Sequence, residues 1–187
     1  MTLNNVTINS TDTKTENIAQ NISLVHFKDL CTNINFTKRN VIVSFRFMSV
    51  EVANYMLNNM TKDSILIVIE QNRHEAELLA SSVHDHRLKI HHDSPECIDF
   101  IIQRYNEKVD YVISSLVFSN ISPLIAENIV MKTREALKET GVFLPYESFE
   151  HVQGQELKQL LEKHFSLTDE SYLMKSTPPL RLYKAMK

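Results

Sequence analysis

Short runs of aliphatic and β-branched residues alternate along the chain with longer stretches in which apolar residues recur every three or four positions. Runs of the first kind are typical of strands buried on both faces, and the second spacing is that of amphipathic helices. The predicted strands are 41–45, 64–70, 87–92, 109–114 and 141–146. The predicted helices are 49–59, 73–83, 95–105, 123–138 and 155–164. This alternation predicts an α/β fold with βαβ units and a mostly parallel sheet.

The two ends of the chain extend this pattern. Apolar residues at helical spacing predict an N-terminal helix over 18–31, whereas the polar residues 1–16 are expected to be flexible. Near the other end, segments 166–174 and 180–185 are expected to form an antiparallel strand pair. No shift in composition marks a linker, so residues 17–187 are predicted to form a single domain.

Composition and charge narrow the classes of function. The chain has 187 residues and a net charge of -3, so no basic surface for nucleic acid is expected. Residues 1–16 show no signal-peptide pattern, and the longest aliphatic run, 65–69, is far shorter than a membrane span. Cys31 and Cys97 match no metal or redox spacing. We therefore expect a cytoplasmic protein with two reduced thiols.

Glycine is nearly absent, because Gly141 and Gly154 are the only two in the chain. Nucleotide-binding α/β domains usually hold their ligand with a glycine-rich turn after the first strand, where backbone with φ > 0 approaches the cofactor closely. The first 140 residues offer no such turn. Gly141 is instead expected to end the 123–138 helix, with the next strand following it.

Several segments occur in an order that a known family shares. They are 66–72 (Leu-Ile-Val-Ile-Glu-Gln-Asn), 91–94 (His-His-Asp-Ser), 109–119 (Val-Asp-Tyr-Val-Ile-Ser-Ser-Leu-Val-Phe-Ser), 137–143 and 177–183. This series resembles the class I S-adenosylmethionine-dependent methyltransferases. It is most similar to the bacterial phospholipid N-methyltransferases, which are related to the rRNA adenine dimethylases. The resemblance implies a Rossmann-like methyltransferase fold with S-adenosylmethionine as the cofactor.

The resemblance also implies roles for residues at the carboxyl ends of the predicted strands. Glu70 would accept hydrogen bonds from the ribose diol of the cofactor. Asp93 would take the exocyclic amine of the adenine, the Ser94 N–H would meet a ring nitrogen, and Ser114 would complete the cofactor contacts. The pocket for the methyl acceptor would be lined by Ser115, Leu116, Val117, Phe118 and Tyr146.

The turn after the first strand departs from the family pattern, in which an acid precedes alternating glycines. Two alignments are open. Either Val41–Phe45 is the first strand and 46–49 replaces the glycine turn, or 42–48 matches the segment that precedes a first strand missing here. A sheet without its central strand would leave an uncovered gap in the core, so we expect Val41–Phe45 to be that strand.

Both alignments predict weak or lost cofactor affinity. Side chains of Phe45, Phe47 and Met48 would occupy the space of the methionine carboxylate and ribose. Residues other than glycine would also resist φ > 0 at this turn. A smaller departure is Val117, which stands where the family has a proline.

Plainer interpretations of these residues stay open. Asp93 and Ser94 equally suit the cap of a helix that starts at Pro95, and Glu70 suits the dipole of the helix that follows it. Four His and two Asp lie within 84–93, but strand alternation places neighbouring side chains on opposite faces, so no metal site is expected. The 18–31 helix suits either peripheral membrane contact or packing against the sheet.

Two hypotheses of function follow. The first is an S-adenosylmethionine-dependent methyltransferase that acts on a phospholipid headgroup or another small amine. The second is a degenerate methyltransferase fold, a pseudoenzyme that serves as a binding or regulatory module, with a protein partner, or that carries out other chemistry. The family resemblance favours the first hypothesis, and the missing glycines favour the second.

Overall fold

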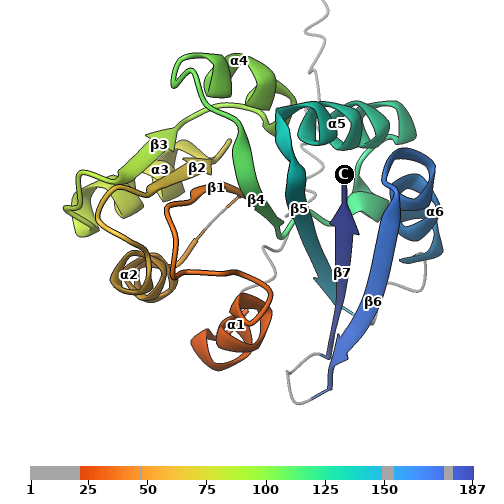
Figure 1. Cartoon of the computed structure of the whole chain (residues 1–187), viewed down its shortest axis with the longest axis horizontal. Coiled ribbons are helices and arrows are strands. Elements are labelled where there is room, and N and C mark those ends of the chain that lie inside the picture. Colours follow the sequence, from red (N-terminus) through yellow and green to blue (C-terminus); the bar gives the residue numbers. More distant parts are fainter. Residues whose placement is uncertain (1–21, 47, 149–153, 175–178) are drawn as a thin grey trace, which may run out of the picture.

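The computed structural model describes residues 22–46, 48–148, 154–174 and 179–187. A seven-stranded sheet forms its centre, in the order β3-β2-β1-β4-β5-β7-β6 (Figure 1). The strands are β1 Val41–Phe45, β2 Ile65–Ile69, β3 Leu88–His91, β4 Val109–Ser114, β5 Leu137–Ser148, β6 Leu167–Leu173 and β7 Leu180–Met186. Strands β1 to β5 are parallel, while β7 lies antiparallel between β5 and β6. The predicted α/β fold and its C-terminal antiparallel pair are confirmed.

Strand β1 lies in the middle of the sheet. Its central residue, Val43, pairs with Ile67 of β2 on one side and with Val112 of β4 on the other. All five of its residues are buried, as expected for a strand covered on both faces. Of the two alignments, the structure therefore supports the one in which Val41–Phe45 is the first strand and the following residues form its turn.

Helices cover both faces of the sheet. They are α1 Leu24–Cys31, α2 Val50–Asn59, α3 Arg73–Ser82, α4 Ile98–Gln103, α5 Pro123–Ala136 and α6 Gly154–His164, with short 3₁₀ turns at Pro95–Cys97 and Phe118–Asn120. One core cluster joins α4, α5 and α6 to the sheet, and a second joins α1, α2 and α3 to the opposite face. Figure 1 shows α4 and α5 along the upper border of the molecule and α1 and α2 along the lower border.

The N-terminal helix is shorter at its start than predicted. It begins at Leu24, because Ser23 has extended backbone (φ -64°, ψ 152°) and acts as the N-cap. The apolar side of α1 packs inward through Phe27, Leu30 and Cys31. Residues 18–21 and the polar segment 1–16 lie outside the described residues.

The predictions that Gly141 acts as a helix stop and that the strand begins there are wrong. Helix α5 ends at Ala136, and Leu137 already has extended backbone (φ -68°, ψ 147°) and begins β5. The pairing with β4 then shifts, because Val109 is opposite Leu137 whereas Tyr111 is opposite Val142. Gly141 lies inside this bulge, where a Cβ atom would be 2.9 Å from the Lys138 carbonyl oxygen. The glycine is needed for close approach of the backbone and not for a helix stop.

No helix within the described parts of the chain is both long and apolar enough to cross a membrane.

Candidate functional site

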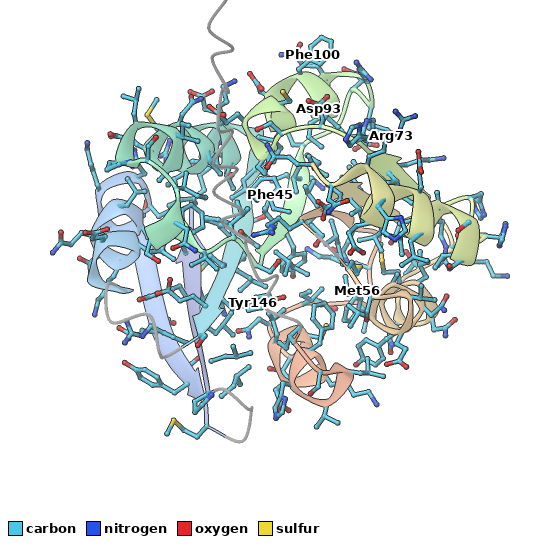
Figure 2. All side chains as sticks on the ribbon, turned by 180° about the vertical axis from the view of Figure 1, so that it is seen from behind. Phe45, Met56, Arg73, Asp93, Phe100 and Tyr146 are labelled. Atoms are coloured by element: carbon cyan, nitrogen blue, oxygen red, sulfur yellow. The ribbon has the colours of Figure 1, made fainter. Side chains whose placement is uncertain are left out.

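The carboxyl ends of β1 to β4, with the adjoining part of β5, form one edge of the sheet. Open α/β sheets bind ligands at this edge, in the loops that follow the strands. Capping residues begin two helices here: the Ser49 hydroxyl accepts from the Val52 N–H, and the Asn72 side chain accepts from the N–H groups of His74 and Glu75. Figure 2 labels Phe45, Asp93 and Tyr146, each on or directly after one of these strands.

Glu70 directly follows β2 and is buried, with 4% of its surface exposed. Its Oε1 accepts a hydrogen bond of 2.7 Å from the Asn72 N–H, whereas its Oε2 is buried without a hydrogen-bond partner. Burial raises the pKa of the Glu70 carboxyl, while the Asn72 N–H and the charge of Arg46 act in the opposite direction. The site therefore holds a carboxylate oxygen that is free to accept a hydrogen bond from a ligand.

Asp93 lies beside Glu70, because its N–H donates to the Glu70 carbonyl at 3.2 Å. The Asp93 Oδ1 accepts from the Ser94 N–H at 3.0 Å, so the donor expected to meet an adenine nitrogen is already engaged. The Ser94 hydroxyl accepts from the Glu96 N–H and caps the 3₁₀ turn that starts at Pro95. Hydrogen bonds from Cys97 and the Ser94 N–H lower the pKa of Asp93. The capping role is thus present, and the adenine contact stays a prediction.

The turn after β1 contains no glycine, yet one of its residues has left-handed backbone. Arg46 has φ 70°, and its N–H donates to the Ile69 carbonyl at 2.9 Å. We expected residues other than glycine to resist this geometry, and Arg46 adopts it at a cost of about 1 kcal/mol. Sequence reasoning did not single out Arg46, since a backbone angle of this kind has no sequence signal outside Gly, Asn and Asp.

The side chains expected to fill the turn go to different places. Phe45 is fully buried and packs edge-on against Phe143, with ring centroids 6.5 Å apart, so it lies in the core and not in the turn. Met48 is buried in the cluster beneath α1 and α2. Phe47 lies outside the described residues. The expectation that Phe45 blocks the cofactor space is therefore wrong, because strand alternation directs its ring into the core.

The serines at the end of β4 bond within the fold. Ser114 is fully buried, and its hydroxyl accepts from the Leu116 N–H at 3.2 Å. The Ser115 hydroxyl donates to the Phe45 carbonyl at 3.4 Å, and Ser115 lies close enough to Tyr146 to act on the pKa of its phenol. Burial raises the pKa of the Tyr146 phenol, which therefore stays protonated at neutral pH. Ser115 thus joins the end of β1 to the residues that follow β4.

The residues expected to form the acceptor pocket lie on both faces of the sheet. Leu116 and Phe118 belong to the core beneath α4, α5 and α6, whereas Tyr146 belongs to the opposite core. Phe118 lines a groove of about 290 Å³ between α5 and α6. Val117 is also buried. The structure therefore brings Ser115 and Tyr146 together and separates Phe118 from them.

Tyr146 borders a pocket of about 280 Å³ beneath α1 and α2. Its walls include Phe27, Ser44, Met48, Val52, Ile113 and Tyr146. Sequence reasoning missed most of these residues, although one signal was present: Ser44 is the single polar residue in the otherwise apolar strand β1. The described lining contains Glu51 but no Lys, Arg or His.

Two histidines of the segment 84–93 have hydrogen-bond partners within the fold. Nε2 of His91 lies 2.7 Å from the Tyr105 hydroxyl, and Nε2 of His92 lies 2.9 Å from the Gln71 carbonyl oxygen. Among the residues that the structure describes, no three His, Cys, Asp or Glu side chains come close enough together to hold a metal ion.

Sequence comparison gives no relatives: no family model matches the chain, and no curated protein matches it. Comparison with solved structures finds many chains of similar fold. An S-adenosylmethionine-dependent O-methyltransferase from Thermotoga maritima has a TM-score of 0.67 at 15% identity, covering 90% of this chain and 67% of that one. A Burkholderia thailandensis 1,6-didemethyltoxoflavin-N1-methyltransferase with bound S-adenosylhomocysteine has a TM-score of 0.63 at 12% identity, covering 86% and 75%.

The same fold also occurs in a spermidine synthase from Thermotoga maritima, with a TM-score of 0.59 at 14% identity. The match covers 81% of this chain and 54% of the synthase. At such identities the likeness concerns the fold, since one fold hosts several activities. The sheet order, the helices on both faces and these neighbours together show that the chain has the Rossmann-like fold of the class I S-adenosylmethionine-dependent methyltransferases.

Proposed function

We propose that the chain binds S-adenosylmethionine at the carboxyl edge of β1 and β2 and transfers its methyl group to a small amine in the pocket beside Tyr146. The observation that carries this proposal is the unpartnered Oε2 of the buried Glu70. A buried carboxylate oxygen without a donor is costly, and a ligand hydroxyl relieves that cost. Glu70 stands at the end of the second strand, the position from which this class of fold holds a ribose diol.

Different residues of the chain would bind different parts of the ligand. Glu70 would hold the ribose hydroxyls, and Asp93, tied to Glu70 through the backbone, would border the adenine. When bound, S-adenosylmethionine supplies a methyl group on a positively charged sulfur. The amine nitrogen would form the new bond to carbon as the carbon–sulfur bond breaks, and S-adenosylhomocysteine and one proton would be released.

The residues that line this pocket suit an amine substrate that carries no phosphate group better than a phospholipid headgroup. A phospholipid headgroup would bring a phosphate into a space whose described lining offers no cation. The apolar wall from Phe27, Val52 and Ile113 instead lowers the pKa of an ammonium group by desolvation, against the opposite effect of a carboxylate such as Glu51 in the same lining. A neutral amine has the free electron pair that methyl transfer needs. The hydroxyls of Ser44 and Tyr146 would orient it, and proximity would supply most of the rate acceleration.

The alternative is a binding module without transferase activity. Its support is the turn 46–49, Arg-Phe-Met-Ser, which contains no glycine. On this alternative, a nucleoside binds weakly or not at all.

Calorimetric titration tests the proposed function. The wild-type protein should bind S-adenosylmethionine and S-adenosylhomocysteine in the micromolar range. Glu70→Gln should weaken both by about tenfold or more, because a charge-assisted hydrogen bond is lost. Glu77→Gln, an exposed change on the adjoining helix α3, is the matched control and should bind as the wild type does. If no heat of binding is measured at millimolar ligand, the proposed function is wrong.

A further inference from the structure

Arg46 occupies the position between the end of β1 and the start of the α2 cap. Its backbone is fixed in the left-handed region at φ 70°, and its N–H is bonded to Ile69, the residue before Glu70. Since Phe45 pairs with Ile69 in the sheet register, Arg46 and Glu70 are the next residues along two adjacent parallel strands. The two side chains therefore leave the sheet at the same edge.

Their charges act on each other. The positive charge of Arg46 favours the ionised form of Glu70, so the guanidinium group lies within electrostatic range of the carboxylate. The Glu70 Oε2 nevertheless has no hydrogen-bond partner, so Arg46 does not close off that oxygen. The edge thus presents a cation and a hydrogen-bond acceptor beside each other, which suits a ligand that carries both an anionic group and hydroxyl donors.

We infer that Arg46 holds the carboxylate of the amino-acid part of the cofactor and so takes over the task of the absent glycine turn. This inference rests on the proposed function. A glycine turn approaches a ligand with backbone N–H groups, whereas a guanidinium group reaches a carboxylate with two parallel hydrogen bonds. Arg46 would then determine which adenosine compounds bind: those that keep the amino-acid carboxylate bind tightly, and those without it bind less well.

Two ligands distinguish recognition of the amino-acid carboxylate by Arg46 from a general effect of Arg46 on nucleoside binding. S-adenosylhomocysteine contains the amino-acid carboxylate, and 5′-methylthioadenosine has the same nucleoside and sulfur without it. The informative variant is Arg46→Gly, because glycine adopts φ 70° without strain and the turn keeps its shape. The matched control is Arg73→Ala, which removes an exposed arginine at the start of α3 that pairs with Glu77.

Calorimetry with both ligands gives the test. Arg46→Gly should bind S-adenosylhomocysteine about 10- to 100-fold more weakly than the wild type, with no change for 5′-methylthioadenosine. Arg73→Ala should match the wild type for both ligands. Equal losses for the two ligands, or no loss for either, would overturn the role of Arg46 while leaving the proposed function intact. If the wild-type protein binds neither ligand, the proposed function fails and the role of Arg46 fails with it.

Discussion

At the scale of single residues, Glu147 is a buried acid outside the candidate site whose pKa is strongly raised. It lies on β5 opposite Arg181 of β7, with 2% of its surface exposed, and its Oε1 is buried without a hydrogen-bond partner. Burial raises its pKa from 4.5 to about 7, against the attraction of Arg181, and the nearby Glu170 adds to the rise. Folding therefore places an acid where its protonated form is preferred.

This burial predicts a pH-dependent stability. Because the pKa of Glu147 is higher in the folded chain, the folded state binds its proton more tightly, and that contribution is lost as pH rises from about 4.5 through about 7. Glu147→Gln keeps a neutral side chain and should be more stable than the wild type at pH 8, by about 1–3 kcal/mol. The two proteins should differ little at pH 5.

Urea unfolding at pH 5 and pH 8 measures this difference. The exposed Glu162→Gln on α6 is the control and should follow the wild type at both pH values. A Glu147→Gln protein that is less stable than the wild type at pH 8 would contradict the account, since it would mean that the ionised carboxylate stabilises the fold.

Single residues of the site were predictable only where a local pattern marks them. Glu70 was identified because an acid directly after an aliphatic strand is visible in the sequence. Arg46 and the wall residues Phe27 and Val52 were not, because the left-handed angle at Arg46 has no marker in its residue type and the pocket forms only when α1 and α2 meet the sheet. Tertiary contacts of this kind leave no trace in a short window of sequence.

At the scale of elements, the periodic segments were predicted well and their junctions less so. Strands β1 and β4 have the predicted bounds, because both are mostly apolar, β-branched runs that are buried along their whole length. The start of β5 was missed, since the polar residues between Leu137 and Gly141 show no strand alternation. The bulge there is set by pairing with β4, which the sequence of β5 alone cannot reveal.

The bulge gives a prediction for Gly141→Ala. The added methyl group would lie 2.9 Å from the Lys138 carbonyl oxygen, which is backbone and cannot move aside as a side chain can. We expect a loss of about 1–3 kcal/mol in the free energy of unfolding, measured by chemical denaturation. Glu139→Ala, an exposed change in the same bulge, should cost much less. Equal stability of Gly141→Ala and the wild type would show that the bulge has room for a side chain.

At the scale of the whole molecule, the central place of β1 links the two halves of the candidate site. Glu70 follows its neighbour β2 on one side, and Ser115 follows its neighbour β4 on the other. Ser44 of β1 lines the pocket beside Tyr146. A ligand held at Glu70 and extended across the end of β1 would therefore bring its far end toward that pocket. The alternation of strands and helices predicted the fold, and the central placement of Val41–Phe45, which was also expected, is confirmed by its pairing with β2 and β4.

A crystal structure of the protein with S-adenosylhomocysteine would show whether the cofactor lies between Glu70 and Arg46. The ribose hydroxyls should lie within about 3.2 Å of the Glu70 carboxylate, and the amino-acid carboxylate should lie at Arg46. Its sulfur should point toward the pocket that Ser44 and Tyr146 line. A structure at saturating ligand in which the nucleoside is absent from the edge of β1 and β2, or is bound elsewhere, would contradict the account.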